Sequence, residues 1–186
     1  MNGHHTRFRT VLIGIVAMAV MTYPVAATAD RAELTKDAQA ALNNLYAKVD
    51  GAKVLGTKAL AILVFPKITK AGLGIGGQHG DGALMKGGSP VAYYSTSGGS
   101  VGLQAGVQTY GYAMFFKNDK ALQQLDDANG FEVGVGPTVV VLDEGKAKQM
   151  TTTTAKDDIY AFIFSQKGLM AGLGIQGNKI KKEDPK

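Results

Sequence analysis

The sequence predicts an α+β fold in which an antiparallel, strongly curved, barrel-like sheet dominates. Near the start of the chain, one stretch has the apolar spacing of an amphipathic helix. After Gly51, short segments rich in β-branched and aromatic residues follow one another, separated by glycine-containing turn signals. Strands and helices do not alternate as a parallel sheet requires, so the pattern favours a mainly antiparallel sheet with few helices.

Residues 1–29 are predicted to be a cleaved signal peptide. Arg7 and Arg9 precede an apolar run at 11–21, and "ATA" at 27–29 supplies small residues for cleavage between Ala29 and Asp30. The apolar run is too short for a membrane anchor, because at 1.5 Å per residue it covers only about half of a ~30 Å hydrocarbon core. The sequence therefore predicts export.

Composition limits what the remaining chain does. The whole chain has a formal net charge of +5, and loss of Arg7 and Arg9 lowers it to +3. This charge is too small for a nucleic-acid-binding protein but is compatible with an anionic lipid surface. The chain has no cysteine, which excludes thiol catalysis, cysteine metal sites and lipoprotein-type acylation. We expect one domain at 30–180, followed by a disordered basic tail at 181–186.

The first element, at 30–49, is predicted to be an amphipathic helix. Its apolar stripe recurs every three or four residues and its charges cancel. We expect it to pack on the sheet. The alternative is a helix lying on a membrane surface, which is usually more basic. The stripe consists of Leu34, Ala38, Leu42, Leu45 and Val49.

The strands are predicted from Ala59 onward. "ALAILVF" (59–65) is typical of a buried strand that ends at Pro66, and the later segments are separated by the turn signals "GDG", "GGSP", "SGG" and "DEG". "TTTT" at 151–154 fits an exposed strand. One helix, at 118–130, is predicted from a cap at Asn118 or Asp119 and a stop at Gly130. The lysine-rich end, 178–186, is expected to be frayed and solvated.

Two similar stretches, "AGLGIGG" (71–77) and "AGLGIQG" (171–177), match the G-x-G-x-x-G pattern of dinucleotide-binding loops. Neither is followed by the helix that such a site requires, so we expect no nucleotide. A two-residue period fits better, with Leu73 and Ile75 on one face of a strand and glycines on the other. Such a glycine face indicates either a sharply bent sheet beneath a helix or the floor of a ligand or lipid groove. Its predicted members are Gly72, Gly74, Gly76, Gly102, Gly106, Gly172 and Gly174.

The sequence offers little for catalysis. His79, the only histidine after residue 29, lies beside Asp81 in "QHGDG". A His–Asp pair orients a base only when a nucleophile or metal lies nearby. We expect a turn at this pentapeptide, no enzymatic activity, and no metal or cofactor.

Several motifs resemble those of the SYLF domain family, in the expected order from about Ala47 to Ile180. They are "GTKALAILVFPKITKAGLGIGGQHGDG" (56–82), "GSVGLQAGVQ" (99–108), "VGPTVVVL" (135–142) and "IYAFIFSQKGLMAGLGIQGNKI" (159–180), which contains the closing "KGLMAG". The resemblance implies lipid binding. Eukaryotic members bind phosphoinositide-containing membranes, and some bind actin. This chain is more similar to exported bacterial members, for which actin is not an expected partner.

The leading hypothesis is therefore a periplasmic, non-enzymatic protein that binds anionic phospholipid. In eukaryotic members a basic N-terminal helix contributes to membrane binding, and the neutral 30–49 segment departs from that pattern. The alternatives are an envelope protein-interaction module without a lipid ligand, and a hydrolase centred on His79. Lysines that flank the matching core are the candidate phosphate contacts: Lys53, Lys58, Lys67, Lys70 and Lys167.

Overall fold

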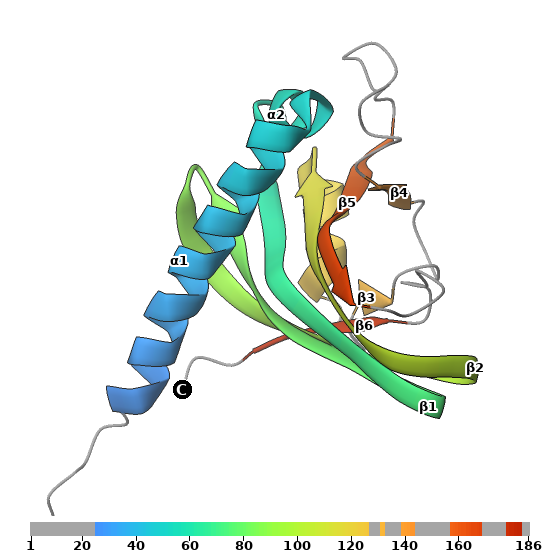
Figure 1. Ribbon diagram of the computed structural model, residues 1–186. Coiled ribbons are helices and arrows are strands. Elements are labelled where there is room, and N and C mark those ends of the chain that lie inside the picture. The colour runs from blue at the N-terminus through green and yellow to red at the C-terminus, as the bar shows by residue number, and fades with distance from the viewer. Residues whose placement is uncertain (1–24, 127–130, 133–138, 144–156, 169–177, 184–186) are drawn as a thin grey trace, which may run out of the picture.

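The computed structural model describes residues 25–126, 131–132, 139–143, 157–168 and 178–183, and it shows a mixed α+β domain (Figure 1). Three α-helices and a 3-10 turn accompany a six-stranded, mostly antiparallel sheet. In chain order the elements are α1 (Val25–Lys48), α2 (Asp50–Gly56), β1 (Ala61–Lys86), β2 (Ser89–Phe116), α3 (Asp119–Gln123), η1 (Gln124–Asp126), β3 (Phe131–Glu132), β4 (Val139–Asp143), β5 (Ile159–Gly168) and β6 (Lys179–Lys182).

Strands β1 and β2 form one long antiparallel ribbon that accounts for most of the sheet. They pair from Ala61 opposite Phe116 to Lys86 opposite Ser89. The hairpin turn is at Gly87 and Gly88, whose positive φ angles of 59° and 85° suit glycine. The predicted turn in "GGSP" is thus confirmed. The predicted turns in "QHGDG" and "SGG" are wrong, because both stretches continue the ladder inside β1 and β2.

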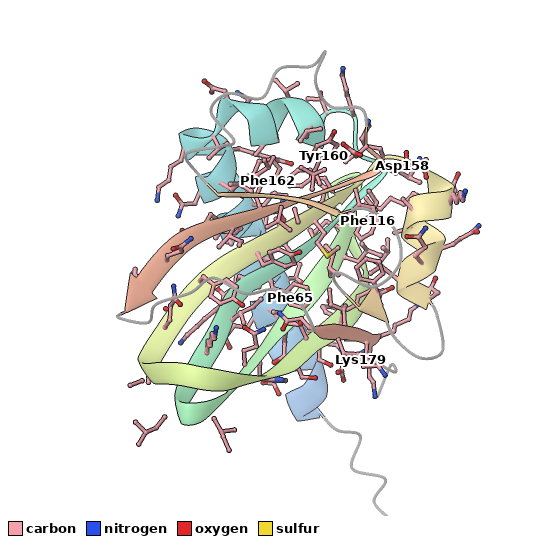
Figure 2. All side chains as sticks on the ribbon, turned by 90° about the vertical axis from the view of Figure 1, so that its right-hand side faces the viewer. Phe65, Phe116, Asp158, Tyr160, Phe162 and Lys179 are labelled. Carbon is pink, nitrogen blue, oxygen red and sulfur yellow. The ribbon has the colours of Figure 1, made fainter. Side chains whose placement is uncertain are left out.

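The ribbon doubles back on itself at its middle. The ladder shifts register between Leu73 and Ile75, where Gly74 has a φ of 74°. Both views show β1 and β2 running to a protruding end, turning, and returning across the molecule (Figures 1 and 2). A Cβ at Gly80 would lie 2.8 Å from the backbone oxygen of Lys67, so the two arms of β1 lie in close contact.

The remaining strands extend the sheet from the edge of β2 that is opposite β1. The strand order is β3-β6-β2-β5-β4, with β1 on β2, and the β4–β5 pair is the parallel one. No ladder joins β3 to β4 among the described strands, so the described sheet is open, and the expectation of a barrel-like sheet stays a prediction.

Strand β1 begins as a continuous apolar run because both of its faces are covered. Ala61, Leu63 and Phe65 belong to the core between the two arms of the ribbon, whereas Ile62 and Val64 face the helices. Figure 2 shows Phe65 among the strands, with Tyr160 and Phe162 nearer the helices.

Helix α1 packs on the sheet as predicted. Ala38 and Leu45 are buried, Leu34 and Leu42 are half-buried, and Val49, the last residue of the predicted stripe, is buried just after the helix ends. At the other predicted helix, the Asn118 side chain accepts a 2.8 Å hydrogen bond from the backbone N–H of Ala121, which confirms the cap. The predicted stop at Gly130 lies outside the described residues.

Two predictions about the extent of the strands are wrong: the end of the first strand at Pro66 and the frayed chain end. β1 does not end at Pro66, because a register shift between Phe65 and Ile68 accommodates the proline as a bulge. The chain end is not frayed at 178–182: Asn178 and Ile180 are buried, and β6 pairs with both β2 and β3. The segments 151–154 and 171–177, with Gly172 and Gly174, lie outside the described residues.

Candidate functional site

The bend of the ribbon projects two large apolar side chains. Leu73 is 85% exposed and Ile75 is 74% exposed, whereas most apolar residues of β1 are buried. We call Leu73, Gly74 and Ile75 the ribbon tip. Val107, which faces Ala71 on the paired strand, is also exposed, so the apolar surface continues onto β2. In Figure 1 the two strands reach this protruding end far from α2.

The glycines of "AGLGIGG" build the bend. Gly74 has a positive φ, and a Cβ at Gly72 would lie 2.5 Å from the Cα of Gly76. This segment therefore bends sharply, as one of the two interpretations of the glycine face supposed. Helix α1 covers Ile62 and Val64 of β1 instead of these glycines. Gly106 also has a positive φ, of 128°, and Gly102 lies in β2.

The five candidate lysines divide into two groups. Lys53 in α2 and Lys58 after it are exposed at the helical end of the molecule. Lys67 and Lys167 are exposed toward the bend, where Lys167 faces Thr109 and Thr109 faces Thr69. Lys70 belongs to the second group by position, but its side chain is buried at 5% exposure.

The strands near the bend carry charge of one sign. Strand β2 contains no charged residue, β5 contains only Lys167, and the 66–80 stretch of β1 contains Lys67 and Lys70 but no acid. We call this part of the sheet the cationic end. The nearest acid along β1 is Asp81, one residue beyond this stretch, where it pairs with His79, so positive charge remains in excess.

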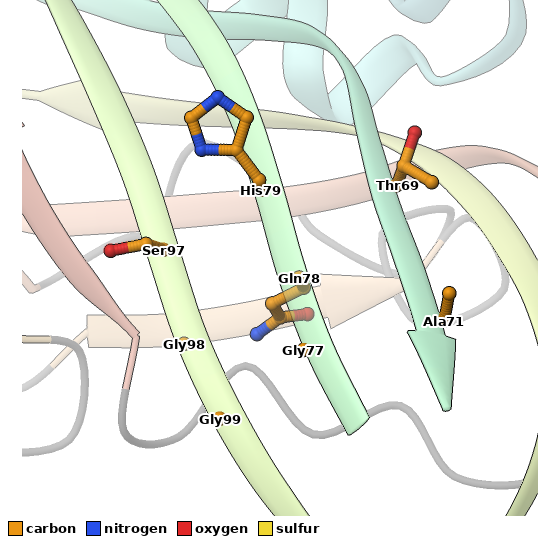
Figure 3. Close-up of a pocket in the computed structure, with 8 residues that line it drawn as sticks. All are labelled: Thr69, Ala71, Gly77, Gln78, His79, Ser97, Gly98 and Gly99. Carbon is orange, nitrogen blue, oxygen red and sulfur yellow. The ribbon is translucent and has the colours of Figure 1, made fainter. Parts of the chain in front are cut away.

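An open hollow of about 540 Å³ lies behind the ribbon tip. Figure 3 shows its walls on three neighbouring strand segments, with Thr69 and His79 projecting on the same side. A Cβ at Gly99 would meet nothing within 4 Å, so glycine leaves this part of the floor open. The lining residues are Thr69, Ala71, Gly77, Gln78, His79, Ser97, Gly98 and Gly99.

A partly buried polar network holds the floor of the hollow in place. Tyr110 donates a 2.7 Å hydrogen bond to Oε1 of Gln78, and the Gln78 amide nitrogen donates to Oδ1 of Asn178. Burial raises the pKa of Tyr110 to about 12, although its interaction with Asn178 opposes the rise. The Tyr110 hydroxyl therefore stays protonated as a donor at neutral pH. The network joins both arms of the ribbon to the start of β6.

The His79–Asp81 pair lies on the surface of β1. Nε2 of His79 is 3.5 Å from Oδ1 of Asp81, and both side chains are more than half exposed. Ser97 faces His79 in the ladder, but its side chain points away from the imidazole (Figure 3). This arrangement lacks the hydrogen-bonded chain from nucleophile to base that a catalytic triad requires.

The described residues contain no group of three or more His, Cys, Asp or Glu side chains that could hold a metal ion. None of their helices is both long and apolar enough to cross a membrane.

Sequence reasoning missed the ribbon tip. Alternation placed Leu73 and Ile75 on one face of a strand but did not predict that both are exposed at a bend, where the register shift occurs at Gly74. The available signal was a cluster of glycines in both strands of the ribbon, at 72, 74, 76 and 77 in one strand and at 98, 99, 102 and 106 in the other. Together they mark a point at which both strands of one ribbon are able to bend.

Comparison with known proteins identifies the second half of the chain. Residues 97–186 match the family model described as "Ysc84: Las17-binding protein actin regulator". No curated protein sequence matches the chain. The match begins in β2 and takes in all the later strands, including the "KGLMAG" motif that pointed to the SYLF family. The match over residues 97–186 is therefore consistent with a domain of the SYLF (Ysc84) family.

Proposed function

We propose that this protein is exported to the periplasm and binds anionic phospholipid membranes without catalysing a reaction. The observation that carries the proposal is the cationic end of the sheet, where exposed Lys67 and Lys167 outnumber Asp81, the nearest acid of β1. A lysine near an anionic membrane surface contributes about 1 kcal/mol of attraction.

The family supports this proposal at a coarser level. SYLF domains are associated with lipid and actin binding, and the matching model names actin regulation. An exported protein does not meet actin, so lipid is the partner that fits both the family and the predicted signal peptide. The open, exposed His79–Asp81 pair supports a binding function over a hydrolytic one.

Vesicle co-sedimentation tests the proposal. The protein is purified after export, and its mass reports whether residues 1–29, which include the apolar 11–21 run, were removed. We expect it to pellet with phosphatidylglycerol vesicles at low salt, less at high salt, and little with phosphatidylcholine vesicles. Failure to pellet with anionic vesicles at low salt would contradict lipid binding, because screening is then weak.

A charge-matched pair of variants tests which end of the molecule meets the lipid. Lys67→Gln with Lys167→Gln removes two charges from the cationic end and should weaken binding roughly thirtyfold. Lys53→Gln with Lys58→Gln removes the same charge at the helical end and should leave binding nearly unchanged. Equal losses in the two double variants would mean that net charge, and not the cationic end, determines binding.

A further inference from the structure

We propose that the ribbon tip penetrates the apolar layer of the membrane, so that Leu73 and Ile75 lie among the acyl chains while Lys67 and Lys167 meet the headgroups. This inference rests on the proposed lipid binding and adds how the protein is oriented and which residues enter the bilayer. The starting observation is that the two most exposed large apolar side chains of the described residues occupy one bend.

The tip has a shape that suits lipid better than a protein partner. It is a protruding end of a two-stranded ribbon, and a protein would need a complementary pocket to bury both side chains. A bilayer deforms around an inserted side chain and requires no such pocket. Full burial of a leucine-sized side chain is a substantial driving force, and no described residue of the protein buries Leu73 or Ile75.

Most of the backbone beside the tip is paired. The ladder holds on both sides of the bend, with Leu73 opposite Ala105 and Ile75 opposite Val101, and the register shift leaves Gly74 and residues 102–104 outside it. Pairing satisfies the N–H and C=O groups of the residues within the ladder, which would otherwise oppose entry into hydrocarbon. Neither arm carries a charged residue within two positions of the tip, since 71–77 contains only alanine, glycine, leucine and isoleucine.

The spacing along the strands matches the layers of a bilayer. Thr69 and His79 lie four residues from Leu73 and Ile75, which is about 13 Å of extended chain. Apolar groups of interfacial proteins enter about 5–10 Å, and the headgroup layer lies immediately outside. The hollow lined by Thr69 and His79 is then at headgroup depth, and Lys167 is level with Thr69 through Thr109.

The charge around the ribbon tip favours an anionic bilayer, and not a second copy of this chain, as the surface that the tip contacts. The tip is bordered by the cationic end, so two tips brought together would juxtapose Lys67 and Lys167 of one copy with those of another. An anionic bilayer has the complementary charge, and its electrostatic and apolar attractions act at the same contact.

Serine variants at the tip provide the test. Leu73→Ser should weaken partitioning into phosphatidylglycerol vesicles roughly tenfold, and adding Ile75→Ser should weaken it roughly tenfold more. Both side chains are exposed in the free protein, so thermal unfolding of the variants should match that of the wild type. Val91→Ser is the matched control, because Val91 is 56% exposed at the hairpin end of the ribbon, and this variant should bind as the wild type does.

A lipid monolayer measures penetration itself. Wild-type protein should raise the surface pressure of a phosphatidylglycerol monolayer, and the double tip variant should not. If wild type binds vesicles and the double variant binds equally well, the penetration model is overturned while lipid binding stands. If wild type binds no vesicles, both are overturned. Loss of a concentration-dependent dimer in the double variant, with vesicle binding unchanged, would make a second copy the occupant and would also overturn the model.

Discussion

Gly82 and Gly99 belong to the same ribbon, but they are glycines for different reasons. A Cβ at Gly82 would lie 2.6 Å from Cδ1 of Phe65 and 2.8 Å from the backbone oxygen of Val64, so this glycine allows the two arms of β1 to pack closely. Gly99 faces open space above the hollow. At the residue scale, the glycine pattern of the sequence therefore combines packing positions, bend positions and an open surface.

Paired alanine substitutions separate these roles. Gly82→Ala should lower the free energy of unfolding by about 1–3 kcal/mol, because the added methyl group overpacks the contact between the arms. Gly99→Ala should change it by less than about 0.5 kcal/mol or raise it slightly, because the methyl group meets nothing and the unfolded chain loses freedom. Urea titrations of both variants measure the difference. A stable Gly82→Ala protein would mean that the arms are not in close contact.

At the scale of elements, patterns that depend on local spacing were read correctly from the sequence. The stripe of α1, the cap at Asn118 and the turn at Gly87 and Gly88 each depend on a few neighbouring residues. Elements whose structure depends on residues far away in the sequence were not predicted correctly. "QHGDG" looks like a turn by itself, but Asp81 is paired with Ser95 across the ribbon, and tertiary pairing overrides the local preference.

Strand β6 shows the same limit most clearly. Its sequence is lysine-rich, yet Ile180 is fully buried between Thr96 of β2 and Phe131 of β3, while Lys181 and Lys182 face solvent. One apolar residue among lysines is too weak a pattern to predict a strand without knowledge of its two partners. The exposed ribbon tip was missed for a related reason, since the register shift at Gly74 depends on both strands of the ribbon.

Neighbouring substitutions in β6 test whether this strand belongs to the domain. Ile180→Ala should lower the free energy of unfolding by about 2–5 kcal/mol, the usual cost of emptying a fully buried aliphatic site. Lys181→Ala, one position along and exposed, should change it by no more than about 0.5 kcal/mol. Chemical denaturation followed by circular dichroism measures both. Equal, small effects of the two substitutions would mean that this segment is a frayed tail, as its composition alone suggests.

At the scale of the whole molecule, the two ends differ in kind. Helices α1 and α2 cover the outer face of the sheet toward one end, and the bent ribbon projects its apolar tip and exposed lysines toward the other (Figure 1). The polar network of Gln78, Tyr110 and Asn178 lies just behind the bend and ties it to β6. This polarity orients the protein in the proposed complex, with its tip in the bilayer and its helices away from it.

A tryptophan placed at the tip tests that orientation most directly, because the chain contains no tryptophan of its own. With phosphatidylglycerol vesicles, Leu73→Trp should shift its emission to shorter wavelength and be quenched by lipids brominated along the acyl chain. Val91→Trp, at the hairpin end, should show neither effect while binding equally well. Water-like, unquenched emission from Leu73→Trp in vesicle-bound protein would contradict the account.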